Sequence, residues 1–134
     1  MKGSDVSLKH LQRALTMELT TVNTYFYQER QLNDWGVDRL AKRMREETDE
    51  EREHANRFLT RLLFLDGEAD VSTLEPIKPP ESVRQIFDTQ YEMEKEAVAY
   101  YSRAAQECHE AGDIGSFRLF SSILKDEEEH IDFI

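Results

Sequence analysis

Two groups of glutamate and histidine residues in this sequence share one spacing. A glutamate is followed after 33 residues by a Glu-x-x-His pair, and this pattern occurs twice. The six residues are Glu18, Glu51, His54, Glu94, Glu127 and His130. Carboxylate oxygens and imidazole nitrogens without thiolate bind iron, manganese and zinc. Residues three apart lie on one face of a helix. The repeated pattern therefore predicts two copies of one metal-binding half-site.

These six residues also fall on the apolar faces of the predicted helices. Any one of them alone has a simpler interpretation, because acidic runs on helices are usually solvated and a single histidine is more often structural than a ligand. Together, however, they would bury four carboxylates, and each unpaired buried charge costs on the order of several kcal/mol. Two divalent cations would balance the four negative charges. A dimetal site is therefore predicted, and the ligand types leave iron, manganese and zinc open.

The elements that must position these residues are four helices. Helical periodicity and end signals predict helices near 4–35, 38–65, 82–111 and 113–134. Residues 68–80 contain all three prolines and are expected to form a long crossover. Short, long and short connections predict an all-α, ferritin-like antiparallel four-helix bundle. In the third helix the apolar spacing places five residues inward: Phe87, Tyr91, Val98, Tyr101 and Ala105. In the fourth it places Phe120, Ile123 and Ile134 inward.

Length and composition limit the classes of function. The chain of 134 residues is expected to form a single domain over 1–134. Its net charge of −11 argues against a nucleic-acid partner, and its single cysteine excludes an intrachain disulfide. It has no apolar stretch long enough for a signal peptide or a membrane helix, so no membrane association is expected and a cytoplasmic location is predicted.

At the six site residues the sequence resembles the bacterioferritins, and the resemblance extends along the chain. It includes the segments LTMELTTVNTYF around Glu18, EETDEEREHANRFL around His54 and ILKDEEEHIDFI at the end. The ligand pattern of two glutamates and two Glu-x-x-His pairs is that of ferritin-like di-iron proteins. The resemblance implies that Glu18 and Glu94 are terminal ligands and that Glu51 and Glu127 bridge two irons. His54 and His130 then supply one nitrogen ligand each.

The resemblance also implies a function. Bacterioferritins store iron, and their ferroxidase centre oxidises Fe²⁺ with dioxygen or hydrogen peroxide. Their 24 subunits form a shell of paired subunits around ferric mineral. Tyr25 corresponds to a tyrosine that can donate an electron, although plain core packing explains it equally well.

Two positions depart from the family pattern. Arg52 stands where bacterioferritins have the methionine that binds haem, so this subunit is not expected to bind haem itself. A shell mixed with a haem-binding paralogous subunit would supply that methionine. The family continues beyond the position of Ile134, through more of helix four and a short fifth helix, so further sequence is expected there.

Three other functions are compatible with such a bundle. The first is another dimetal enzyme, either a rubrerythrin-like peroxidase or a manganese catalase, because a fold does not determine its chemistry. The second is a protein that sequesters iron without oxidising it. The third is a helical interaction module in which the six residues coincide by chance. No rubredoxin-type CxxC motif is present, which weakens the rubrerythrin-like alternative.

Overall fold

The computed structural model describes residues 1–134 except for the side chain of Phe133. Four helices follow one another, and no strand occurs in the backbone that is described. They are α1 (Asp5–Asp34), α2 (Asp38–Phe64), α3 (Val83–Glu110) and α4 (Ile114–Phe133). The predicted ends lie close to the observed ones, and the all-α fold class is confirmed. None of the described helices is long and apolar enough to cross a membrane.

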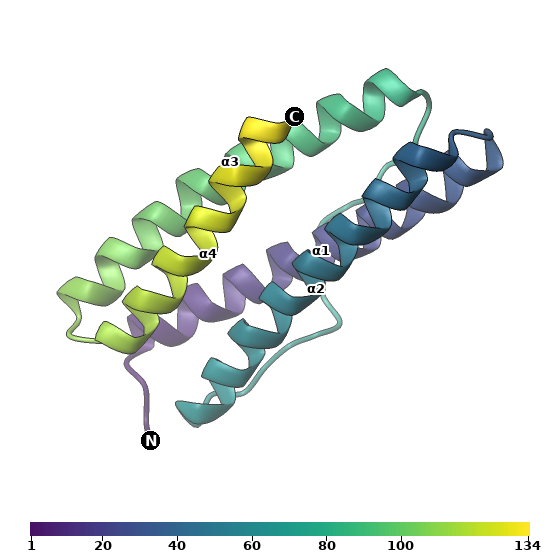
Figure 1. Ribbon diagram of the computed structural model, residues 1–134. Helices are drawn as coiled ribbons and strands as arrows, with labels where there is room; N and C mark the ends of the chain where they lie inside the picture. Colours follow the sequence, from purple (N-terminus) through teal and green to yellow (C-terminus); the bar gives the residue numbers. More distant parts are fainter.

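The four helices form two antiparallel pairs (Figure 1). α1 packs against α2, and α3 packs against α4. The chain between α2 and α3 returns along the length of the bundle, as predicted for the crossover. It is fixed to α1 by two hydrogen bonds between Gln12 and the backbone of Asp70, and by a 2.7 Å ion pair between Arg13 and Glu75. The crossover lets α3 run parallel to α2, which brings the second half of the sequence opposite the first.

Local signals explain where the helices begin and turn. The side chains of Ser4, Ser82 and Asp113 accept hydrogen bonds from backbone amides in the first turns of α1, α3 and α4. Such caps satisfy amides that have no partner within the helix. The turns between paired helices contain Gly36 and Gly112, with φ of 80° and 81°. Glycine enters this left-handed region without steric cost, so the chain can reverse within a few residues.

The apolar core is divided by a polar layer. One cluster lies toward the start of α1 and includes Leu11, Phe58 and Phe120. The other lies toward the opposite end and includes Leu32 and Met44. The six predicted ligands fall between these clusters along the helices. The burial of the two clusters contributes most of the folding free energy and thereby holds the charged layer in place.

The third helix corrects one part of the predicted core. Tyr91 is 41% exposed, while Phe87 and Val98 are only half-buried. Glu94, Tyr101 and Ala105 are buried as predicted, but Ile86, Gln90 and Ala97 occupy the inward positions that were expected for Phe87, Tyr91 and Val98. The buried residues of this helix are Ile86, Gln90, Glu94, Ala97, Tyr101, Ala104, Ala105 and Cys108. Ile134, also predicted inward, is 39% exposed at the end of α4.

Candidate dimetal centre

The structure brings all six predicted residues together in the middle of the bundle. α1 supplies one glutamate, α3 supplies another, and α2 and α4 each supply a Glu-x-x-His pair. Every one of the six is buried, with at most 7% of its surface exposed. Because each Glu-x-x-His pair lies on a single helical turn, the carboxylate and the imidazole point the same way. The residues are Glu18, Glu51, His54, Glu94, Glu127 and His130.

Their ligand atoms form two overlapping groups. Within each group, one atom from every residue lies within 4.8 Å of the others. The first group consists of Glu18, Glu51, His54 and Glu127. The second group consists of Glu51, Glu94, Glu127 and His130. Glu51 and Glu127 belong to both groups, which is the geometry expected for carboxylates that bridge two cations.

The first half is centred on the imidazole of His54. Its Nδ1 atom lies 2.8 Å from Glu18 Oε2, 3.2 Å from Glu127 Oε1 and 3.6 Å from Glu51 Oε2. Its other nitrogen, Nε2, lies 3.0 Å from the carboxylate of Asp126. A hydrogen bond from Nε2–H to Asp126 fixes the ring and directs Nδ1, which is hydrogen-bonded to Glu18, toward the cluster of carboxylates, as outer carboxylates commonly do for metal-binding histidines.

The second half repeats this plan around His130. Its Nδ1 atom lies 3.1 Å from Glu51 Oε1, 3.4 Å from Glu127 Oε1 and 3.6 Å from Glu94 Oε1. Its Nε2 atom makes a short hydrogen bond to the carboxylate of Glu50. The two imidazole rings are inclined by 25°, with their centroids 6.3 Å apart. Each half thus holds its histidine by a carboxylate from the other helix pair.

Several inward-pointing polar atoms have no hydrogen-bond partner although they are buried. Close contacts such as that between His130 Nδ1 and Glu51 Oε1 do not have the geometry of a hydrogen bond. The atoms are Glu51 Oε1 and Oε2, Glu94 Oε2, Glu127 Oε1 and His130 Nδ1. Buried polar atoms are normally satisfied, because each one left without a partner costs about 1–3 kcal/mol. Clustered carboxylate oxygens and imidazole nitrogens that are buried without a hydrogen-bond partner are suited to binding cations.

The electrostatics of the protein alone show how strongly this cluster demands positive charge. Burial, followed by the charges of Glu51 and Glu127, raises the pKa of Glu18 well above its usual value. Burial also raises the pKa of Glu94 to about 7. Burial by itself lowers the pKa of His54, but its contacts with Glu127, Glu18 and Glu51 outweigh that effect and raise it. Protons therefore compensate the carboxylates wherever no metal does so.

Tyr25 lies against this centre as predicted. Its hydroxyl, which is completely buried, donates a 2.7 Å hydrogen bond to Glu94 Oε1. Burial, with the negative charges of Glu94 and Glu51, raises the pKa of this phenol. The hydroxyl is thus directed at a predicted ligand rather than lying at the edge of the core. Both packing and electron donation remain compatible with this position.

Two carboxylates outside the predicted ligand set, Asp126 and Glu50, hold the outer nitrogens of the histidines. The repeated ligand spacing does not include them. With Glu47 and His130, Glu50 forms a third cluster of possible ligands that extends from the centre to the surface. A pocket of about 400 Å³ between α2 and α4 opens there. Its lining includes both imidazoles together with Arg43, Glu50, Glu53, Arg57, Asp126 and Glu129. Each outer carboxylate binds a histidine of the other helix pair, so spacing within one helix gives no signal for either contact.

Comparisons with known proteins agree with this architecture. A family model described as a ferritin-like domain matches residues 8–134. A bacterioferritin of Brucella melitensis is 39% identical over 134 residues, covering 100% of this chain and 83% of the relative. The solved structure of Rhodobacter capsulatus bacterioferritin, described with a metal-free dinuclear site and haem iron, has a TM-score of 0.96 at 38% identity. That match covers 99% of this chain and 83% of the other. Mycobacterium tuberculosis bacterioferritin has the same TM-score at 32% identity, with 99% and 84% covered.

Proposed function

Because the chain belongs to the bacterioferritins of the ferritin-like family, we propose that it stores iron and oxidises Fe²⁺ to Fe³⁺ at the buried centre. The observation that carries this proposal is the sharing of Glu51 and Glu127 between two groups of buried ligands. Two bound iron ions supply the redox chemistry, each passing one electron to dioxygen or hydrogen peroxide. The protein supplies the ligands, the balancing charge and the fixed geometry.

Each residue has a separate task in this proposal. Glu18 and His54 would hold one metal, while Glu94 and His130 would hold the other. Glu51 and Glu127, which belong to both ligand groups, would keep the two ions close enough to supply two electrons to one oxidant molecule. Asp126 and Glu50 hold the outer nitrogens of the histidines, which fixes the direction of Nδ1. The four ligand carboxylates, Glu18, Glu51, Glu94 and Glu127, neutralise two divalent ions without further counter-ions.

The pocket between α2 and α4 is the proposed path for Fe²⁺. It reaches the outer edges of both imidazoles. Glu50 at its rim has a side chain that is 59% exposed, whereas Glu47 is nearly buried next to His130. Carboxylates at increasing depth attract a cation and replace part of its hydration shell before it enters the centre.

Haem does not fit at the position where the family binds it. Arg52 is exposed on α2, and its guanidinium has no lone pair to offer to haem iron. We propose that shells of this subunit alone bind no haem through residue 52. Adding haem to the unchanged protein should produce no Soret band of an axially ligated haem. The Arg52→Met variant places a methionine ligand at that position, and the same measurement on it tests whether haem binding is restored. A full Soret band in the unchanged protein would contradict this proposal.

The assembly and location also remain proposals. We propose that paired subunits of this single-domain chain build a 24-subunit shell in the cytoplasm, alone or mixed with a haem-binding paralogous subunit. A shell gives the oxidised iron an enclosed space in which to form mineral. Mass photometry of the purified protein tests this, because a shell and a dimer differ in mass by an order of magnitude.

Aerobic addition of Fe²⁺ to metal-free protein tests the oxidation directly. Ferric absorbance should rise faster than in protein-free buffer, and a Glu18→Ala, Glu94→Ala double variant should lose this acceleration. An Asp34→Ala, Glu92→Ala double variant is the matched control, because it removes two exposed carboxylates from the same two helices. Equal rates in wild type and the ligand variant would overturn the ferroxidase proposal.

The same experiment separates the alternatives. Stoichiometric Fe²⁺ binding without faster oxidation would indicate sequestration alone. Faster oxidation with peroxide but no retained ferric product would indicate a peroxidase. Metal analysis of the protein as isolated distinguishes iron from manganese and zinc at the same ligands.

A further inference from the structure

The second half of the sequence contains a counterpart of Tyr25 that the ligand pattern does not use. Tyr25 lies seven residues after Glu18 on α1, and Tyr101 lies seven residues after Glu94 on α3. The side chain of Tyr101 is completely buried, and its hydroxyl has no hydrogen-bond partner. Seven residues are two helical turns, so Tyr101 shares the inward face of α3 with Glu94, and its ring packs against Phe58 and Phe120 in the core cluster beside the ligand layer. Burial, followed by the charge of Glu18, raises the pKa of this phenol, as that position requires.

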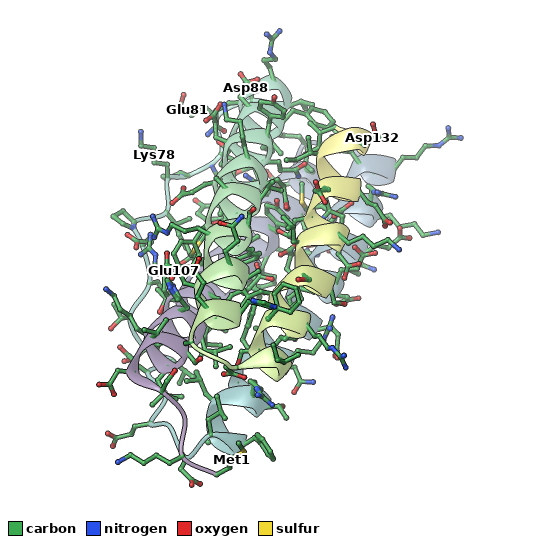
Figure 2. The ribbon with its side chains drawn as sticks, turned by 90° about the vertical axis from the view of Figure 1, so that its left-hand side faces the viewer. Met1, Lys78, Glu81, Asp88, Glu107 and Asp132 are labelled. Atoms are coloured by element: carbon green, nitrogen blue, oxygen red, sulfur yellow. The ribbon has the colours of Figure 1, made fainter. Side chains whose placement is uncertain are left out.

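The ring of Tyr101 leads away from the centre to a second tyrosine. Tyr100 lies beside it, with ring centroids 6.2 Å apart and planes inclined at 65°. The Tyr100 hydroxyl is 2.6 Å from Nδ1 of His10, which is buried on α1. At the far side of that imidazole, Nε2 is 2.9 Å from Glu107, which Figure 2 shows on α3. Four side chains thus connect the centre to the surface.

The contact with Glu107 sets the tautomer that a neutral His10 adopts. The bond from His10 lowers the pKa of Glu107, so this carboxylate is ionised and can only accept. Nε2 of His10 then donates to Glu107. When His10 is neutral, its Nδ1 carries no proton, and the Tyr100 hydroxyl donates to it. A neutral His10 is thus a base in contact with the Tyr100 phenol, and a carboxylate orients it.

This chain of contacts suits the loss of an electron from tyrosine. An oxidised phenol is a very strong acid, so its oxidation is much easier when a base accepts the proton at once. Nδ1 of His10 is such a base, and the resulting imidazolium is stabilised by the adjacent Glu107 carboxylate. Tyr101 has no base at its hydroxyl, and the acceptor for Tyr25 is the predicted ligand Glu94. Among these three tyrosines, Tyr100 is the one whose proton has a destination outside the metal site.

We propose that Tyr101 relays an electron from Tyr100 to the dimetal centre, and that Tyr100 becomes a neutral radical while its proton passes to His10. The proposal rests on the ferroxidase function proposed above. It applies when hydrogen peroxide reacts at a centre that holds a single Fe²⁺. That ion supplies only one of the two electrons that reduce the peroxide. Tyr100 then gives the second electron. One peroxide, one Fe²⁺, one tyrosine, one neutral histidine and two protons yield two waters, Fe³⁺, the tyrosyl radical and imidazolium.

Freeze-quench electron paramagnetic resonance tests the relay. Protein loaded with one equivalent of Fe²⁺ per chain is mixed with hydrogen peroxide, in a Tyr25→Phe background that removes the other candidate donor. A tyrosyl radical is expected, and adding Tyr100→Phe should abolish most of it. Tyr91→Phe is the matched control, because Tyr91 is an exposed tyrosine on the same helix. An unchanged radical yield after loss of Tyr100 would overturn the relay.

Further measurements distinguish failure of the proposed electron transfer from misfolding of a variant and from loss of the ferroxidase function. A nitroso spin trap applied to the wild type should label Tyr100, which a surface pocket of about 410 Å³ makes accessible. Labelling of other tyrosines but not of Tyr100 would count against the proposal even if a variant failed to fold. His10→Gln should lower the radical yield, since it removes the base. Ferric iron in the same samples without a Tyr100 radical overturns only the relay, whereas absence of ferric iron overturns the ferroxidase function.

Discussion

The two halves of the dimetal centre share one plan for holding metal but differ in the surroundings of their tyrosines. In both halves, a carboxylate from the opposite helix pair fixes the outer nitrogen of the histidine, through Asp126 in one and Glu50 in the other. The hydroxyl of Tyr25 donates to the ligand Glu94, whereas that of Tyr101 has no partner. The two halves are therefore alike where they hold the histidines and unlike at the tyrosines.

The largest effects on metal binding are expected when a ligand carboxylate is removed, and they should differ between a carboxylate in both ligand groups and one in a single group. Glu51 belongs to both ligand groups, so Glu51→Ala is expected to abolish binding of both ions. Glu18 belongs to one group only, so Glu18→Ala should reduce the capacity from about two ions to about one per chain. Titration of metal-free protein with Co²⁺, followed by its visible absorbance, measures this. Equal losses in the two variants would show that the carboxylates are not shared as described.

The stability of the metal-free protein should depend on pH through the buried carboxyl of Glu94. Burial raises the pKa of Glu94 to about 7, so the carboxyl is neutral at low pH and becomes a buried charge as pH rises. The stabilising contribution of the protonated form is full below the unfolded pKa of roughly 4.3 and is lost as pH rises through about 7. Glu94→Gln, which stays neutral, should therefore stabilise the metal-free protein at pH 8 by up to about 3 kcal/mol.

Urea unfolding in the presence of a chelator measures this difference. At pH 5 the gain from Glu94→Gln should shrink to less than about 1 kcal/mol, because the wild-type carboxyl is then mostly protonated. Glu92→Gln is the control, since this glutamate lies on the same helix but is exposed. A gain of equal size at both pH values would mean that Glu94 is not the titrating group.

The outer carboxylates should matter less than the ligands themselves. Asp126→Asn and Glu50→Gln are each expected to weaken metal affinity by roughly 10-fold to 100-fold, because the histidine they orient becomes less fixed and less basic. The Asp126 side chain is 44% exposed and that of Glu50 is 59% exposed, so the Asp126 variant should show the larger effect. Competition with a chelator of known affinity measures both. A larger loss of metal affinity in the Glu50 variant than in the Asp126 variant would contradict this prediction.

The tyrosines should give the smallest effects on stability, with a difference between the halves. At pH 8, where Glu94 is ionised, Tyr25→Phe removes a hydrogen bond to a charged group and should cost about 1.5–3 kcal/mol in the metal-free protein. Tyr101→Phe removes a buried hydroxyl that has no partner, and should be neutral or stabilising by about 1 kcal/mol. Thermal unfolding of the two variants side by side provides the comparison. Equal destabilisation would remove the distinction between the two tyrosines.

The sequence was sufficient for the bundle and for the six candidate ligands because both depend on local spacing. Helical periodicity and capping residues locate helix ends, and a Glu-x-x-His pair needs only one helical turn. Three inward positions of α3 were predicted incorrectly for a different reason. Tyr91 and Phe87 fit an apolar stripe as well as Ile86 does, and only packing against neighbouring helices places Ile86 inside.

Contacts between distant helices were also beyond the sequence. His10 is separated from Tyr100 by 90 residues and from Glu107 by 97, so no local spacing indicates that they meet. In the sequence His10 is an isolated histidine, and an isolated histidine is usually structural. The hydrogen bonds that give it a possible role as a base become visible only in the fold. The same holds for the pairing of Asp126 with His54 across α4 and α2.

Anomalous scattering at the iron edge from crystals soaked in Fe²⁺ tests the central claim most directly. Two peaks are expected within the bundle, one in each ligand group, with Glu51 and Glu127 in contact with both. Data collected on either side of the edge identify the metal as iron. A single peak, or iron only at the surface cluster around Glu50, would contradict the proposed dimetal centre.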